Sequence, residues 1–265
     1  MDDVTLNDGY VMPRLGMGTW QLIDSQAASV VRDGIDLGYR LVDTAAIYGN
    51  ERGVGDGLKN ADVFLTTKLW NDRHDDAEAA LDESLSLLGV EAVDLYLMHW
   101  PVPTQGRFVD AWKAMIALRE AGKARSIGVS NFLPEHLDAI IDATGVTPAV
   151  NQIELHPHFQ QHEARVYHEA HGIVTQSWSP IGQGKDLLAD DTIGRIAAAH
   201  GIGTAPVVLA WHLARGLAPI PKSSSRDHLA DNLSAQQLTL DEAELAAIDA
   251  LDREDGRIGP DPRTF

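Results

Sequence analysis

The strongest constraint on the fold is a regular alternation that runs along the whole chain. Short β-branched apolar runs, which predict strands buried on both faces, alternate with stretches of helical periodicity, at roughly 27 residues per unit. The predicted strands cover residues 15–18, 40–43, 63–67, 93–98, 124–129, 149–154, 173–178 and 217–221. Strand-helix alternation favours a parallel sheet with helices outside, and eight such units close on themselves. The predicted fold class is therefore α/β, a (β/α)8 TIM barrel.

The stretches between the predicted strands carry helix signals. Helical periodicity is clear over residues 76–88, 109–121, 134–143 and 193–200. A glycine directly follows three of these stretches, at Gly89, Gly122 and Gly201, as is common at helix ends. The chain has 265 residues, 44% of them hydrophobic, which suits one barrel of the usual roughly 250 residues. We predict a single domain over 1–265.

An open, doubly wound sheet is the main alternative fold, and it requires a Gly-rich phosphate turn after its first strand. No such turn follows residues 15–18, and the closely spaced glycines at 53–57 fall inside a helical stretch, where they indicate close packing. Ahead of the barrel, Asn7-Asp8-Gly9 separates residues 4–6 from residues 10–12 and predicts a hairpin turn. We expect this N-terminal β-hairpin to cap the barrel floor.

Charge and composition narrow the classes of partner. Lys and Arg (21) against Asp and Glu (39) give a net charge of −18, which repels nucleic acid and anionic membranes. The chain has no cysteine, which excludes disulfides, thiolate metal sites and a cysteine nucleophile. The first residues lack the features of a signal peptide, and no apolar stretch approaches the ~18 residues of a membrane span. We therefore expect a cytoplasmic protein that binds neither nucleic acid nor membranes.

Polar side chains follow the predicted strands, and in a barrel of this kind catalytic groups lie where strands end. The residues that follow three successive strands are Asp43, Tyr48, Lys68 and His99. A phenol is normally a weak acid, and a neighbouring cation such as Lys68 would lower the pKa of Tyr48. Asp43 would hold Lys68 in place, and His99 could hydrogen-bond a substrate oxygen. Each residue alone is more often structural, but the four together favour catalysis with Tyr48 as general acid.

Longer segments around these residues carry a family resemblance. They read DTAAIYGNE at 43–51, TKLW at 67–70, DLYLMHWP at 94–101, GVSNF at 128–132 and IPKS at 220–223. Together they resemble the aldo-keto reductase superfamily over nearly the whole chain. Residues 67–73 and 151–157 are most similar to the bacterial branch of 2,5-diketo-D-gluconate reductases. The resemblance implies reduction of aldehydes or ketones to alcohols, with hydride from a nicotinamide that the protein positions.

The resemblance also implies which residues hold the cofactor and the substrate. Ser130, Asn131 and Gln152 would bind the nicotinamide carboxamide, and Trp178 would stack on its ring. The residues implied beneath the cofactor and at its pyrophosphate are Gly18, Thr19, Ser179, Ile181 and Gly182. The residues implied in an aromatic substrate pocket, beside Tyr48 and His99, are Trp20, Trp70 and Trp100.

The segment after the last predicted strand bears on the choice of dinucleotide. Lys222, Ser223 and Arg226 lead into a helix whose N-terminal N–H groups suit an anion, so the 2′-phosphate of NADP(H) fits there. Where the family usually has Arg, this chain has His228. An imidazole is largely neutral above pH 7, which should weaken the phosphate contact and makes NAD(H) a credible second cofactor. The remaining implied contacts are Asp231, where the family usually has Glu, and Asn232.

Two other functions stay open at this point. One is a regulatory subunit of the same superfamily that binds the cofactor without turnover. The other is a metal-dependent barrel hydrolase, because His156-Pro157-His158 has the spacing of some metal sites, although no nearby carboxylate-histidine cluster completes a ligand set. We expect no metal, a small-molecule carbonyl substrate and, from the resemblance, a monomer.

Overall fold

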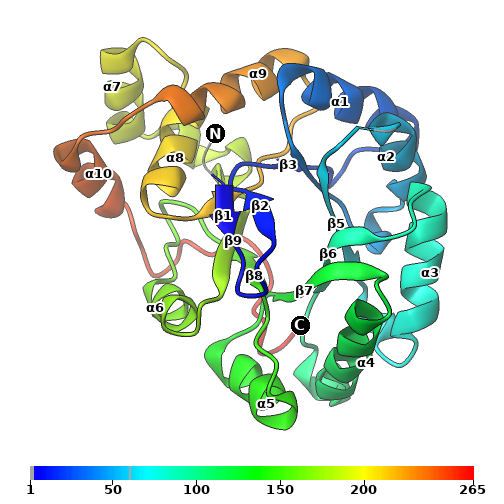
Figure 1. Cartoon of the computed structure of the whole chain (residues 1–265). Helices are drawn as coiled ribbons and strands as arrows, with labels where there is room; N and C mark the ends of the chain where they lie inside the picture. Colours follow the sequence, from blue (N-terminus) through cyan, green and yellow to red (C-terminus); the bar gives the residue numbers. More distant parts are fainter. Residues whose placement is uncertain (1–2, 60) are drawn as a thin grey trace.

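Parallel strands form the wall of a barrel (Figure 1). The computed structural model describes residues 3–59 and 61–265, and over these ranges one sheet of eight strands follows the order of the chain from β3 to β10. The strands are β3 (Met17–Gly18), β4 (Leu41–Asp43), β5 (Phe64–Leu69), β6 (Val93–Met98), β7 (Ala124–Ser130), β8 (Val150–Glu154), β9 (Val174–Trp178) and β10 (Ala218–Pro219). The outer two strands also meet, because Gly16 N–H donates to Pro219 O (3.1 Å) and Gly18 N–H to Pro221 O (3.0 Å). The predicted (β/α)8 barrel is confirmed.

The predicted strands are shortened most where the barrel closes. Strand β6 spans residues 93–98, as the sequence predicts. Strand β10 keeps only two of the five predicted residues. Pro219 and Pro221 have no N–H to donate, so a regular ladder cannot continue through them. Between them, Ile220 N–H still donates to Ser177 O (3.1 Å), which holds the segment against β9.

Helices cover the outside of the barrel. They are α1 (Asp24–Leu37), α2 (Glu51–Leu58), α3 (Ala77–Leu88), α4 (Phe108–Glu120), α5 (Pro134–Thr144), α6 (His162–Ala170), α7 (Asp191–His200), α8 (Thr204–Ala214), α9 (Arg226–Ser234) and α10 (Glu242–Asp249). Glycines let α2 lie close to its neighbours: a Cβ on Gly53 would stand 2.1 Å from Asp24 O of α1, and one on Gly55 would stand 2.3 Å from Leu88 O of α3. The packing interpretation of the glycines at 53–57 is therefore confirmed.

In the part of the chain that the structure describes, no single helix is long and apolar enough to cross a membrane. The pair α7 and α8 passes only when the two are joined across a 94° bend, on length and composition alone.

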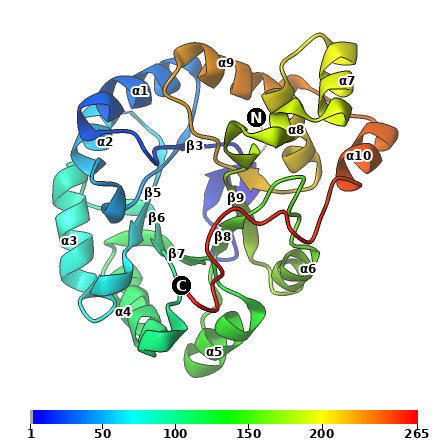
Figure 2. The same cartoon turned by 180° about the vertical axis from the view of Figure 1, so that it is seen from behind.

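An antiparallel hairpin closes one end of the barrel, as predicted. It consists of β1 (Asp3–Thr5) and β2 (Val11–Pro13), and Figure 1 shows it in front of the barrel in blue. Leu6 and Met12 are buried and join an apolar cluster with Leu41 and Leu95 from inside the barrel. Figure 2 shows the C-terminal segment, in red, crossing the opposite end. This opposite end carries the carboxyl ends of the strands and is the end where a site is expected.

A buried histidine outside the barrel mouth makes stability depend on pH. The Asn151 amide nitrogen can only donate, so it makes His168 Nε2 the acceptor (2.8 Å) and leaves Nδ1–H to donate to Thr175 Oγ1 (2.8 Å). Burial lowers the pKa of His168 from 6.5 to about 4. Between these values the unfolded chain binds the proton and the folded chain does not, so stability falls as the pH drops below 6.5.

We expect His168 to contribute a loss of about 2 kcal/mol in the free energy of unfolding between pH 7 and pH 5. Denaturant titrations at both pH values will measure this loss in the wild type and in His168→Gln, whose amide does not titrate in this range. The decline should be smaller in the variant by about this amount. Equal declines in the two proteins would contradict the prediction.

Candidate active site

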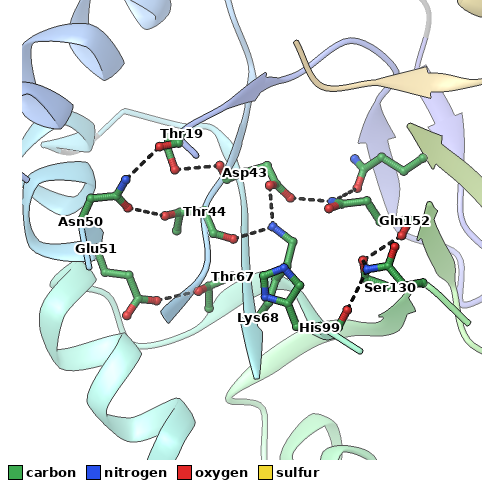
Figure 3. Close-up of polar contacts among 12 residues, drawn as sticks. Thr19, Asp43, Thr44, Asn50, Glu51, Thr67, Lys68, His99, Ser130 and Gln152 are labelled. Atoms are coloured by element: carbon green, nitrogen blue, oxygen red, sulfur yellow. Dashed lines mark hydrogen bonds and ion pairs between the residues drawn. The ribbon is translucent and has the colours of Figure 1, made fainter. Parts of the chain in front are cut away.

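A buried ion pair forms the base of the site at the carboxyl end of the strands. Lys68 Nζ donates to Asp43 Oδ1 (2.5 Å) and to Thr44 O (2.8 Å), and both side chains of the pair are at most 2% exposed. Asp43 is the last residue of β4 and pairs in register with Thr66 of β5, so Lys68 follows two residues later on the same face. Gln152 Nε2, from the middle of β8, donates to the other carboxylate oxygen of Asp43 (2.7 Å; Figure 3).

The two charges of this pair depend on each other. Burial raises the pKa of Asp43, and the attraction and hydrogen bond from Lys68 oppose that rise. Burial lowers the pKa of Lys68, and Asp43 opposes that fall. If either partner were removed, the other would be left as an uncompensated charge in the barrel interior.

The two other predicted catalytic residues lie next to the pair. Tyr48 ends a short 3-10 turn, η1 (Ala46–Tyr48), and Lys68 Nζ lies 5.2 Å from the centre of its ring. The Tyr48 and His99 rings meet edge to face with centroids 5.8 Å apart. The Trp70 and His99 rings also meet edge to face, with centroids 5.0 Å apart. The structure therefore brings Asp43, Tyr48, Lys68 and His99 together at one end of the barrel.

The predicted lowering of the Tyr48 pKa is wrong, because the pKa is raised instead. Burial raises the pKa of Tyr48 well above its usual value of 10.0, and the Asp43 carboxylate adds to the rise. The reason is that the Lys68 charge is offset by Asp43, while the phenolate would lose its hydration. Tyr48 is therefore a neutral phenol that keeps its proton.

His99, whose ring lies against that of Tyr48, is a neutral imidazole. Burial, followed by repulsion from Lys68, holds its pKa well below 6.5. Among the described residues, His99 Nδ1 has no hydrogen-bond partner although it is buried. A neutral imidazole has one donor and one acceptor nitrogen, so it can donate a hydrogen bond without carrying charge.

The ends of β7, β8 and β9 form one hydrogen-bonded network. Ser130 Oγ donates to Gln152 O (2.7 Å), and Asn131 Nδ2 donates to Ser130 Oγ and to His99 O (both 3.0 Å). Trp178 Nε1 donates to Asn131 Oδ1 (2.8 Å), which fixes the edge of the indole. The Asn131 backbone has a φ of 61°, a left-handed conformation that Asn tolerates better than most residues. The structure thus brings the four residues expected at the nicotinamide into contact with one another and, through Gln152, with Asp43.

The other loops expected at the cofactor lie at the same end of the barrel. Thr19 N–H and Oγ1 both donate to Asp43 O at 3.0 Å. Gly18 forms a parallel bridge with Lys222 across the closure of the barrel. After β9, Gly182 N–H donates to Ser179 O (2.9 Å) and starts the short turn η4 (Gly182–Gly184), with Ile181 before it.

In the segment expected at the adenine end, the helix has a side-chain cap and one arginine already forms an ion pair. Ser225 Oγ accepts from His228 N–H (3.4 Å) and caps helix α9. Arg226 Nη1 lies 2.6 Å from Asp33 Oδ1 of helix α1, and both side chains are exposed. Arg226 would have to leave Asp33 to meet a ligand phosphate. The remaining predicted residues divide into Ser223 and Asn232, which are buried, and Lys222 and Asp231, which are partly exposed.

The three predicted substrate-pocket tryptophans differ in their surroundings. Trp70 packs on His99, and Trp100 is 6% exposed with its ring 4.5 Å from that of Phe265. Trp20 is 44% exposed. It lies on a loop that Asn50 holds in place. Asn50 Nδ2 donates to Thr19 O (2.9 Å) and to Leu22 O (3.0 Å), on either side of Trp20.

Sequence reasoning did not assign roles to three residues that the structure brings into the site. Asn50 joins two loops at the mouth and also accepts from Thr44 Oγ1 (2.8 Å). Glu51 accepts from Thr67 Oγ1 behind Lys68 (2.6 Å). Glu154, at the end of β8, binds the C-terminal segment. Asn50, Glu51 and Glu154 lie inside the family-like segments, but their partners come from distant parts of the chain. Within residues 3–59 and 61–265, no group of three or more His, Asp and Glu side chains could hold a metal ion.

Known proteins resemble this chain over nearly its full length. A model of the aldo/keto reductase family matches residues 14–253. The methylglyoxal reductase DkgA of Escherichia coli (strain K12) is 46% identical over 268 residues, which cover 99% of this chain and 97% of that protein. An aldo-keto reductase of Mycobacterium sp. (strain KMS) is 47% identical over 270 residues, with the same shares covered.

A solved structure agrees with these sequence relatives. The crystal structure of a Gox0644 mutant in complex with NADPH superposes with a TM-score of 0.97 and 49% identity, and the match covers 100% of this chain and 98% of that one. The family model and the relatives span the same barrel that carries the site described above. The chain therefore belongs to the aldo/keto reductase family and is an NAD(P)H-dependent oxidoreductase that acts on carbonyl groups.

Proposed function

We propose that this protein reduces small aldehydes or ketones to alcohols with NADPH, and that Tyr48 protonates the carbonyl oxygen. The observation that carries the proposal is the fully buried Lys68–Asp43 pair, with the Tyr48 ring 5.2 Å from the Lys68 amine and the His99 ring beside it. An ion pair is costly to bury, so its position at the carboxyl end of the strands favours a catalytic role.

The residues at this end of the barrel fit a nicotinamide. The oxygens of Asn131 and Gln152 have lone pairs that could accept N–H groups of the carboxamide, and Trp178 offers an indole held in place by Asn131. When bound, the nicotinamide supplies the hydride. Lys222 and the N-terminus of α9 offer positive charge for a 2′-phosphate, and the similar Gox0644 mutant was crystallised with NADPH.

The proton step follows from the charge states of the side chains. Tyr48 keeps its proton because burial raises its pKa, so its O–H can donate to the carbonyl oxygen as that oxygen becomes negative. Neutral His99 can donate a second hydrogen bond and orient the substrate. The Lys68 ammonium then stabilises the negative charge left on the phenol ring.

A panel of carbonyl compounds tests the proposal. We expect NADPH oxidation, followed optically, with at least some small aldehydes and ketones, and the panel should include methylglyoxal because one relative is a methylglyoxal reductase. Turnover should not change after treatment with a chelator. A protein that binds NADPH but turns over none of the compounds would instead be a regulatory subunit, and loss of turnover with the chelator would favour the metal-dependent class.

His228 should weaken the preference for NADPH over NADH. The family usually has Arg at this position, and a guanidinium can bind a phosphate through two parallel hydrogen bonds whereas an imidazole cannot. We therefore expect His228→Arg to raise the ratio of NADPH to NADH affinity at pH 7, measured by fluorescence titration, by about tenfold, the size of one charge-assisted hydrogen bond. An unchanged ratio in this variant would count against a role for His228.

The unit that we propose for this function is the whole chain, 1–265, acting as a monomer. The hairpin packs into the barrel through Met12, and the C-terminal segment reaches Trp100 through Phe265. All residues of the proposed site come from one barrel, so the site needs no second copy. Light scattering of the purified protein will measure its mass. The cytoplasmic location stays a prediction.

A further inference from the structure

A buried carboxylate binds the backbone of the C-terminal tail, defined here as residues 256–265. Glu154 is 1% exposed and ends strand β8. Its Oε1 accepts from Ile258 N–H (2.6 Å), and its Oε2 accepts from Gly259 N–H (2.8 Å). His156 Nε2 lies 3.2 Å from the same Oε1. Hydrogen bonds to a carboxylate are roughly twice as strong as neutral ones, so this contact is a firm attachment of the tail to the barrel.

The tail lies flush against Trp178 at this attachment. A Cβ on Gly259 would stand 2.4 Å from Trp178 Cη2 and 2.9 Å from Glu154 Oε2, so only glycine lets the backbone approach this closely. On its other side, the Trp178 indole donates to Asn131 Oδ1 (2.8 Å). The tail then continues to Phe265, whose ring contacts Trp100. Figure 2 shows this red segment crossing the end of the barrel.

Apart from the ring contact of Phe265 with Trp100, the other polar attachments beyond residue 257 are weaker. Arg263 approaches Glu135 at 3.9 Å, and both side chains are more than half exposed. Such exposed pairs contribute little. Over residues 258–265, the bonds to Glu154 are the only hydrogen bonds to the barrel among the described contacts, and the carboxylate that accepts them is buried. Among the polar contacts, the position of the tail between Trp178 and Trp100 therefore depends mainly on one carboxylate.

We propose that Glu154 is a positioning residue for carbonyl reduction, which holds the tail across the mouth and thereby limits the size of the carbonyl substrate that is accepted. The inference rests on the proposed function, because Trp178 and Trp100 are assigned there to the cofactor and the substrate pocket. Glu154 acts through the tail. With the tail held down, small carbonyl compounds are confined against the site and bulky ones are excluded; with the tail released, this discrimination is lost.

Glu154→Gln is the first test. The amide keeps the size of the side chain but turns one acceptor oxygen towards the tail into a donor, so one backbone N–H loses its partner. We expect KM for a small aldehyde to rise about tenfold, the size of one charge-assisted hydrogen bond. The ratio of kcat/KM for the small aldehyde to kcat/KM for a bulky ketone should fall by about the same factor. The affinity for NADPH should stay within about twofold. Glu135→Gln, at the exposed tail contact, is the matched control and should change none of these values.

Gly259→Ala tests the same contact from the tail and leaves the chemical nature of Glu154 unchanged. Its methyl group cannot fit beside Trp178, so the tail must lift, and the same loss of discrimination is expected. In the double variant with Glu154→Gln, the two effects should combine to less than their product, because both act on one contact. Amide hydrogen exchange at residues 258 and 259 should be faster in both variants, while the barrel strands keep their protection.

Several results would overturn the inference. Unchanged exchange at residues 258 and 259 in Glu154→Gln would show that the carboxylate does not hold the tail. Faster exchange with unchanged discrimination between small and bulky substrates would show that the contact serves stability alone. If the wild type turns over no carbonyl compound, the proposed function fails and the specificity role fails with it, whereas the exchange experiment still decides whether Glu154 anchors the tail.

Discussion

Replacing Tyr48 by Phe should lower kcat by about 10²- to 10⁴-fold, the usual contribution of a general acid. The phenylalanine keeps the ring that packs against His99 and removes only the hydroxyl. Because burial raises the pKa of Tyr48, the hydroxyl that the substitution removes belongs to a neutral phenol, which carries the proton. Turnover will be measured by NADPH oxidation with the best substrate of the panel.

The same variant should bind NADPH as well as the wild type does. Tyr48 has no contact with Asn131, Gln152 or Trp178 among the described hydrogen bonds and ring contacts, so a change at its hydroxyl should leave fluorescence titrations with NADPH within about twofold. Retention of more than about a tenth of the wild-type kcat would refute the role of Tyr48 as general acid.

Replacing Lys68 by Met should lower the free energy of unfolding by about 3–5 kcal/mol, because the Asp43 carboxylate would stay buried without its partner. The Lys68 ammonium is 0% exposed and donates to Asp43 at 2.5 Å. Methionine matches the length of the lysine stem, so the loss reflects the charge more than the packing. Denaturant titration at pH 7 measures the change, and kcat should fall as well because Tyr48 loses the neighbouring cation.

Two further variants separate the buried charge from other causes. Lys68→Met combined with Asp43→Leu should recover much of the stability, since no charge is left unpaired, but none of the activity. Lys113→Met removes an exposed pair with Asp110, whose side chains are 54% and 74% exposed, and should cost less than about 1 kcal/mol. A loss of similar size in Lys68→Met and Lys113→Met would contradict the view that the Lys68–Asp43 pair sustains the site.

Periodicity along the chain was sufficient to predict the barrel. Strand β6 begins and ends where the apolar run predicts, and helices such as α3 and α4 match their predicted ranges within one residue at each end. Such patterns depend on the side chains next in sequence and on which face is buried, so they can be read locally. The predicted strands were shortened most at β3 and β10, where the barrel closes through Gly16 and Gly18 and two prolines interrupt the ladder.

The candidate site was only partly predictable. Parallel strands place their carboxyl ends together, so Asp43, Lys68 and His99 could be expected to meet from their positions after successive strands. The direction in which the pKa of Tyr48 is shifted could not be predicted from the sequence. It depends on how deeply the phenol is buried and on whether Lys68 is free or paired.

The sequence by itself determined the order of strands and helices, the barrel that they form and the chemical groups at its mouth. Only the tertiary structure decided the charge states of those groups and the contacts between distant segments, such as Glu154 with Gly259 and Arg226 with Asp33. The physical reason is that strand and helix patterns arise from neighbours in the chain. Desolvation and hydrogen bonding, by contrast, depend on what surrounds an atom in space.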